Sequence, residues 1–190
     1  MGAKIGWSAH DQNCALFYCG NEFYIEANDV RAQGSLNIEQ EQHIANIRAN
    51  LERGLRELTP HEPQDTTIYL LAGGPSLNDF AEHIKEGAES GVPCVTVNGT
   101  YKWAIDHGIK PGAQFVTDGR AFNKRFVSPV IKDCHYFVSS QCDPSVLEET
   151  PKDQSWMWHV ASKVTLDTVQ EWLEENKDGR IVHPVYGGST

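Results

Sequence analysis

Long hydrophobic runs are absent from this sequence, and so is any excess of positive charge. No stretch approaches the roughly 18 apolar residues that a membrane-spanning helix needs, so we expect no membrane segment. Basic side chains number 16 against 26 acidic ones, which gives a formal net charge of −10. Because binding to nucleic acid depends on Lys and Arg side chains that neutralise phosphates, we expect no nucleic-acid partner.

Two further signals are missing, one at the cysteines and one at the amino end. The five cysteines include no C-x-x-C pair, which argues against a structural zinc site and favours reduced thiols. The opening residues MGAKIGWSAHDQNC lack the basic start and long apolar stretch of a secretory signal. We therefore expect the protein to be cytoplasmic.

Residues 1–64 contain a predicted hairpin and a predicted helix. The runs ALFYC and EFYIEA flank Gly20-Asn21, which indicates a short hairpin. Apolar residues at spacings of three and four then predict one amphipathic helix of roughly five turns, from about Ile38 to Leu58, packed on the core. Its apolar face is formed by Ile44, Ile47, Leu51, Leu55 and Leu58, and Glu, Arg and Asn are assigned to the outer face.

From residue 66 onward, short apolar runs alternate with helix-like stretches. The runs cover residues 67–72, 94–98, 114–117, 136–140, 156–160 and 180–185, and helices are expected over 77–90, 101–107 and 165–176. Apolar strands separated by helices are typical of a parallel sheet that is covered on both faces. We therefore predict an α/β, Rossmann-like nucleotide-binding domain over residues 65–190, with a doubly wound, mostly parallel sheet and helices on both faces, preceded by the long N-terminal helix.

The first of these strands leads into a glycine-rich turn. In α/β sheets ligands bind outside the carboxyl ends of the strands, and here the first strand continues into Gly73, Gly74, Pro75 and Ser76. Glycines let a phosphate approach the backbone, and the following helix offers free N–H groups. We expect Ser76 to cap that helix, with Asp79 as its reciprocal partner. The missing lysine argues against a P-loop kinase, and a plain tight turn is the competing interpretation.

Polar residues also follow the other predicted strands. Asp118 is expected to hold Mg²⁺ or a ribose hydroxyl, with Arg120 as a phosphate clamp, and an ion pair between these two residues is the alternative. His159 is a candidate general base or a satisfied structural histidine. The nucleotide-binding candidates at the remaining strand ends are Asn98, Gln141, Gly188, Ser189 and Thr190.

The tryptophans of this region are expected to serve packing. Trp103, Trp156 and Trp158 are large apolar side chains in or beside predicted helices and strands. We interpret them as core residues rather than as a platform on which a base stacks.

A resemblance to a known family is carried by five segments that occur in this order: LLAGGPSL, CVTVNGTYKWAIDHGIKPGAQFVTDGR, SSQCDP, WMWH and YGGST. Together they resemble the 6-hydroxymethylpterin diphosphokinase MptE-like family, which includes motility-accessory-factor proteins linked to flagellin glycosylation. The resemblance covers roughly residues 66–190 and implies a nucleotide held by Gly73, Gly74, Pro75, Ser76 and Asn98. It also implies a transferase that moves diphosphate from ATP with Mg²⁺.

Two other functions stay open at this point. A more distant similarity to bacterial sialyltransferases implies a glycosyltransferase that uses a CMP-activated nonulosonic acid. A non-catalytic nucleotide-binding module is the third interpretation, because Asp118 is the sole carboxylate found for a metal site. The chain stops at YGGST, where relatives continue into a helix and further strands. We therefore expect either a truncated form or a site completed by another chain, with a homo-oligomer among the alternatives.

Overall fold

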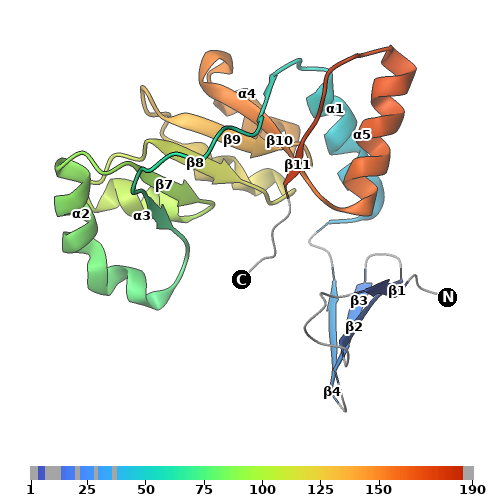
Figure 1. Ribbon diagram of the computed structural model, residues 1–190, viewed down its shortest axis with the longest axis horizontal. Coiled ribbons are helices and arrows are strands. Elements are labelled where there is room, and N and C mark those ends of the chain that lie inside the picture. Colours follow the sequence, from blue (N-terminus) through green and yellow to red (C-terminus); the bar gives the residue numbers. More distant parts are fainter. Residues whose placement is uncertain (1–3, 7–13, 20–21, 28–29, 36–37, 186–190) are drawn as a thin grey trace.

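The N-terminal part of the chain forms a small antiparallel sheet. The computed structural model describes residues 4–6, 14–19, 22–27, 30–35 and 38–185, with side chains from residue 38 onward (Figure 1). The four strands pair in chain order and are β1 (Lys4–Gly6), β2 (Cys14–Cys19), β3 (Glu22–Ala27) and β4 (Val30–Ser35). Cys19 of β2 lies opposite Glu22 of β3, so these two strands form a hairpin around residues 20–21.

A seven-stranded parallel sheet forms the main body of the protein. Its strands are β5 (Arg56–Glu57), β6 (Tyr69–Leu71), β7 (Cys94–Val97), β8 (Ala113–Val116), β9 (His135–Ser139), β10 (Ser155–Val160) and β11 (Pro184–Val185). Their order is β11-β10-β9-β8-β7-β6, with β5 also pairing with β10, and every pair is parallel. The predicted α/β fold with a mostly parallel, Rossmann-like sheet is confirmed.

From β6 onward, helices lie between successive strands of this sheet, and one further α-helix precedes β5. The α-helices are α1 (Gln40–Leu51), α2 (Ala81–Glu89), α3 (Thr100–Asp106), α4 (Pro144–Glu149) and α5 (Lys163–Asn176), and the 3₁₀ helices are η1 (Pro75–Phe80), η2 (Ala121–Val127) and η3 (Lys152–Gln154). In the buried clusters, side chains of all five α-helices pack against the sheet face that carries Cys94, Val116, Val138 and Met157. Apart from β5, the order of the strands across the sheet is the same as their order in the chain. Right-handed crossovers that all run in the same direction place the connecting helices on one side of the sheet. The sequence predicted helices on both faces of the sheet. Within the described residues, the helices cover one face.

The opposite face of the sheet carries a row of aromatic rings. Phe115 of β8 and Phe137 of β9 are neighbours in register and stack with their centroids 4.6 Å apart. Trp156 of β10 continues the row, and the guanidinium of Arg56 lies 4.0 Å from the centre of its ring. These rings are partly exposed, unlike the fully buried residues of the helix-covered face. The sheet therefore has one dry face and one face that solvent partly reaches.

Helix α1 is shorter than the sequence predicts. It ends at Leu51, and Gly54 follows with φ +58°, a conformation that breaks the helical path. Leu55 is buried although it lies beyond the helix, and Arg56–Glu57 joins the sheet beside β10. The expected helix to Leu58 was wrong because the apolar spacing continued by chance into a strand.

The buried face of α1 also contains two asparagines. Asn46 and Asn50 are 1% and 0% exposed, although their polarity assigned them to the outer face. Their amide groups donate hydrogen bonds to backbone carbonyls of loops on the neighbouring sheet. Burying a polar group without such partners is costly, so the loop carbonyls explain why asparagine is found at these positions.

The glycine-rich turn differs from the prediction in its cap. The chain enters the 3₁₀ helix η1 directly after Gly74, and no side chain caps its start. Ser76 lies inside η1, and α2 begins only at Ala81, so the predicted Ser76 cap was wrong. Pro75 at the first position favours this early, tight turn because its φ is already fixed.

Two expectations from composition can be compared with the described residues. Among the helices of these ranges, none combines the length and the apolar character needed to cross a bilayer. Cys94, Cys134 and Cys142 are buried and carry free thiols. Burial raises the pKa of Cys134 to about 11, so its thiol is protonated and unreactive at neutral pH.

Candidate functional site

A hollow of about 800 Å³ lies at the carboxyl ends of the parallel strands. This volume is in the range of small-molecule sites. Each strand from β6 to β11 contributes either its last residues or residues that follow it, because parallel strands present their carboxyl ends at one edge. The lining residues are Ala72, Gly73, Gly74, Leu77, Asn78, Val97, Asn98, Gly99, Thr100, Trp103, Thr117, Gln141, Trp158, Val160 and Val185.

Gly73 and Gly74 leave open backbone at one wall of the hollow. A β-carbon on Gly73 would meet no atom within 4 Å, and one on Gly74 would meet only the Ser76 hydroxyl at 4.0 Å. Neither backbone N–H donates to another described residue. Two successive free N–H groups without side chains in the way form a place where an anionic oxygen can approach the backbone.

Asn98 joins the ends of two neighbouring strands. It follows β7 with φ +49°, a left-handed conformation that asparagine tolerates better than most residues. Its backbone N–H donates to the carbonyl of Phe115 over 2.9 Å, and its Oδ1 accepts from the N–H of Thr117 over 3.3 Å. The side-chain amide is thereby oriented at the hollow, and its Nδ2 has no partner among the described residues.

Gln141 lies on the loop after β9 and also lines the hollow. Its Nε2 donates to the backbone carbonyl of Thr117 over 2.8 Å. In the described part of the chain, its Oε1 has no hydrogen-bond partner. A fixed amide with a free acceptor is suited to a hydrogen bond with a nucleobase or a sugar.

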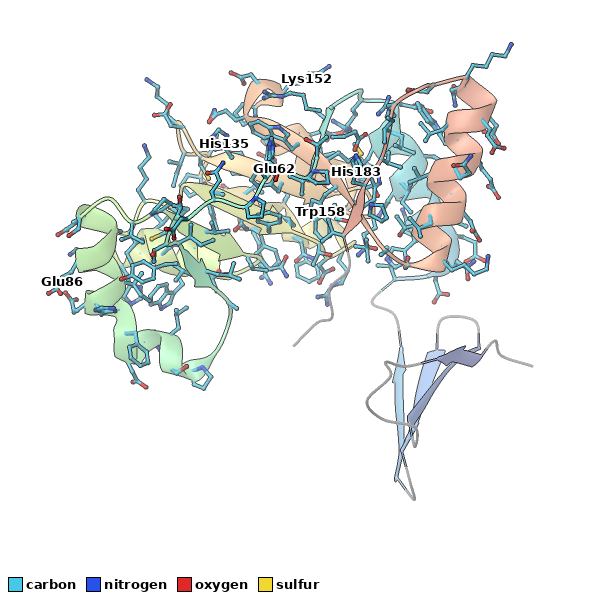
Figure 2. All side chains as sticks on the ribbon, viewed as in Figure 1. Glu62, Glu86, His135, Lys152, Trp158 and His183 are labelled. Carbon is cyan, nitrogen blue, oxygen red and sulfur yellow. The ribbon has the colours of Figure 1, made fainter. Side chains whose placement is uncertain are left out.

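Two tryptophans form apolar walls of the hollow, which corrects their interpretation as packing residues alone. The indole of Trp103 on α3 donates to Oδ1 of Asn78 over 2.8 Å, and that of Trp158 on β10 donates to the Phe137 carbonyl over 3.1 Å. Trp158 lies toward the carboxyl end of its strand, away from His135 at the start of β9 (Figure 2). Their positions in the sequence could have indicated this role. Trp103 lies five residues after Asn98, and Trp158 lies two residues before the end of β10.

Asp118 and Arg120 form an ion pair, and neither lines the hollow. Arg120 Nε lies 2.9 Å and 3.1 Å from the two carboxylate oxygens, and the Arg120 N–H also donates to Oδ1 over 3.1 Å. Burial raises the pKa of Asp118, but the side-chain and backbone hydrogen bonds from Arg120 bring it below its usual value. The pair therefore matches the alternative that the sequence left open.

We expect Arg120→Gln to raise the pKa of Asp118, because burial then acts against fewer opposing hydrogen bonds. In the unchanged protein the lowered pKa stabilises the fold above about pH 4, and that contribution is lost as the pH falls through the folded-state pKa. An NMR titration of the Asp118 carboxyl carbon in both proteins measures the change. An unchanged titration would show that Arg120 does not control this carboxylate.

The described residues offer few ligands for Mg²⁺. They include no group of three or more His, Cys, Asp or Glu side chains placed to hold a metal ion. The lining of the hollow carries no charged side chain, and Asp118 is already held by Arg120. The described residues thus do not fit a protein-built magnesium cage, which needs one or two free carboxylates.

His159 belongs to a buried polar network outside the hollow. Its side chain is 1% exposed, with Nδ1 3.0 Å from the Ser140 hydroxyl and Nε2 3.0 Å from Oε2 of Glu57. The other oxygen of Glu57 accepts from Arg180 over 3.1 Å. A general base must reach the proton that it removes, so this placement gives the catalytic prediction for His159 no support and matches the structural alternative.

The remaining predicted residues lie beside the hollow or outside the described ranges. Pro75 and Ser76 are in η1, next to the lining glycines but not part of the lining. Gly188, Ser189 and Thr190 fall outside the described residues. Val185, the last described residue, does line the hollow.

Comparisons with known proteins give one family and one solved structure. A family model described as 6-hydroxymethylpterin diphosphokinase MptE-like matches residues 41–190, which include every lining residue. No protein with a curated description matches. The solved structure of MAf glycosyltransferase from Magnetospirillum magneticum AMB-1 is similar at a TM-score of 0.49 and 15% identity, over 68% of this chain and 21% of that one. This chain spans about a fifth of that structure, and so low a similarity carries no argument about function.

Proposed function

Because this chain belongs to the 6-hydroxymethylpterin diphosphokinase MptE-like family, we propose that it is a transferase that binds a nucleotide in the hollow at the strand ends. The observation that supports this most is the pair of free N–H groups at Gly73 and Gly74, which line the same hollow as Trp103 and Trp158. Free amides suit phosphate oxygens, and flat rings suit a base or a sugar.

Different lining residues would bind the phosphates, the sugar and the base of the nucleotide. The phosphates would lie against the backbone of Gly73 and Gly74, where no side chain keeps them away. The amides of Asn98 and Gln141 would hydrogen-bond the sugar or the base, since each has an atom without a described partner. The tryptophan indoles are already bonded to the protein, so their rings would act as fixed surfaces.

The finer reaction that we propose is transfer of diphosphate from ATP to an alcohol. The hydroxyl oxygen of the acceptor attacks the β-phosphorus, the bond from that phosphorus to the α-phosphate oxygen breaks, and AMP leaves. The hydroxyl proton goes to solvent, because no described lining side chain is a base. Mg²⁺, when bound, would neutralise phosphate charge, and its ligands would have to come mainly from the nucleotide.

One observation favours a second candidate, transfer of a nonulosonic acid from its CMP-activated form. The lining has no charged side chain to balance the phosphates of ATP. A CMP-sugar of this class carries one phosphodiester and one carboxylate, so it brings less negative charge into the neutral hollow. This donor therefore needs less charge compensation from the described residues than ATP does.

A thermal-shift panel separates these candidates. The ligands are ATP, GTP, CTP, CMP and a CMP-sugar, each with and without Mg²⁺. A ligand at 100 times its Kd stabilises the protein by about 2.7 kcal/mol, a rise in Tm of roughly 5–10 °C. The largest rise with ATP and Mg²⁺, together with AMP release, supports diphosphate transfer, and the largest rise with CMP supports glycosyl transfer. No rise with any ligand contradicts nucleotide binding and favours an interaction module.

A further inference from the structure

Asn46 of α1 connects two loops that end neighbouring strands. Its Nδ2 donates to the carbonyl of Gly119, after β8, over 3.2 Å and to the carbonyl of Gln141, after β9, over 3.0 Å. Gln141 itself lines the hollow, whereas Asn46 does not. One buried amide thus connects the loop that follows β8 to the loop that carries Gln141.

The orientation of the Asn46 amide is set by its own helix. Gln42, one turn earlier, donates from Nε2 to Oδ1 of Asn46 over 2.8 Å. The oxygen of the amide is therefore occupied on the side of Gln42, and the NH₂ group is directed at the two loop carbonyls. Gln42 is exposed, so this contact can be removed without opening the core.

Asn50 holds the same loop one turn later along α1. Its Nδ2 donates to the carbonyls of Ser140 and Cys142 over 2.9 Å and 2.8 Å. Three successive carbonyls, from residues 140 to 142, therefore point at α1. With the backbone held on that side, the Gln141 side chain extends to Thr117 and the hollow.

The fit between the two loops is close at Gly119. A β-carbon at this position would lie 2.6 Å from Cδ1 of Ile38 and 3.0 Å from the carbonyl oxygen of Gln141. Only a residue without a side chain lets the Gly119 loop approach Gln141 this closely. The glycine of the D-G-R segment is thus explained by packing against Ile38, just before α1, and against the Gln141 loop.

We infer that Asn46 is a positioning residue for nucleobase selectivity, an inference that rests on the proposed nucleotide site. By holding the backbone of Gln141 and Gly119, it fixes the direction in which the Gln141 amide presents its unpartnered oxygen to the hollow. Cytosine and uracil exchange donor and acceptor at two adjacent ring positions: cytosine has an amino donor at position 4 and an acceptor at N3, and uracil has a carbonyl acceptor at position 4 and an N–H donor at N3. A fixed amide distinguishes them, and an amide free to rotate does not.

The test compares variants of α1 in the full chain. Asn46→Ala removes the amide, Asn46→Asp keeps its shape but puts oxygens against the loop carbonyls, and Gln42→Ala removes only the orienting contact. Arg48→Ala is the matched control, because Arg48 joins α1 to Glu171 and Glu175 of α5 without touching the loops. Two measurements are made on each: the ¹⁵N-resolved NMR signals of the Gln141 side-chain amide, and the Kd of CMP and of UMP by calorimetry.

We expect both Asn46 variants to shift the Gln141 amide signals and to weaken the preferred nucleotide about ten-fold, with the ratio of the CMP and UMP constants moving toward one. Gln42→Ala should shift the same signals less, and Arg48→Ala should leave signals and ratio unchanged. Unshifted Gln141 signals in the folded Asn46 and Gln42 variants, or equal shifts in Arg48→Ala, overturn the inference. A wild-type protein that binds neither CMP nor UMP contradicts the CMP-sugar candidate rather than the positioning role of Asn46, because the NMR comparison needs no ligand.

Discussion

Replacing Gly74 by alanine is expected to weaken nucleotide binding about 30-fold while the protein stays as stable as before. The residue has φ −176°, an extended conformation that alanine adopts freely, and the new methyl group would meet no protein atom closer than 4.0 Å. The methyl group would instead occupy the space through which a phosphate reaches the backbone. Losing one charge-assisted hydrogen bond costs about 2 kcal/mol, which corresponds to that loss of affinity.

Gly179→Ala is the matched control for this experiment. Gly179 is also open, because a β-carbon at this position would meet no atom within 4 Å, but it does not line the hollow. Both alanines should leave Tm unchanged or slightly raise it, because they restrict the unfolded chain. Calorimetry with ATP and with CMP should show weaker binding for Gly74→Ala alone. Equal affinity in the two variants would place the phosphates elsewhere.

Glu57→Ala is expected to destabilise the protein by about 3 kcal/mol, a fall in Tm of roughly 6–12 °C. The carboxylate is 10% exposed and bonds both His159 and Arg180, each over about 3 Å. Removing it leaves a buried imidazole and a largely buried guanidinium without a shared partner. Arg180 keeps its contact with Asp178, which holds the loss to the lower end of the range for broken buried pairs.

An exposed ion pair provides the comparison for Glu57. Glu175 contacts Arg48 over 2.7 Å, but its side chain is 57% exposed, so Glu175→Ala should leave the stability nearly unchanged. Glu57→Gln should lie between the two alanine variants, because an amide still fits between His159 and Arg180. Urea unfolding at neutral pH measures all three. A Glu57→Ala protein as stable as Glu175→Ala would mean that solvent already screens the network.

The strands of the main sheet were predictable because they are short, apolar and separated by helical stretches. The run CVTVN contains β7 and the run WMWHV contains most of β10, since β-branched and aromatic residues favour extended chain. Their order in the sheet was not predictable, because the pattern of a single strand does not specify its neighbour. The one-sided placement of the helices follows from that order and was therefore missed as well.

Residue patterns failed where tertiary contacts decide. The spacing of Leu55 and Leu58 continues the helical pattern of α1, yet β10 draws Arg56–Glu57 into the sheet. Asn46 has the polarity of a surface residue, but loop carbonyls far along the chain make it a buried one. Two-residue strands and buried amides depend on partners about 70 to 100 positions away, which no local pattern shows.

The candidate site was predictable in its location more than in its chemistry. Gly73, Gly74, Asn98 and Gln141 line the hollow because each follows a parallel strand. Asp118 also follows a strand, but its side chain turns to Arg120 two residues later, a contact that the sequence allowed without requiring. The roles of all these residues in binding stay predictions until the ligand panel and the Gly74 variant are measured.

Strand β10 has a consequence for how the chain acquires its structure. One of its edges is shared by β5 and β11, so segments near residues 56 and 184 must both reach it, and Glu57 meets His159 across 102 positions. Pairings between such distant segments form slowly, because a large loop must close first. During synthesis on the ribosome the part of that edge that pairs with β11 remains uncovered until β11 emerges, and an uncovered strand edge can associate with other chains. We therefore expect the nascent protein to depend on chaperones more than its modest size would suggest.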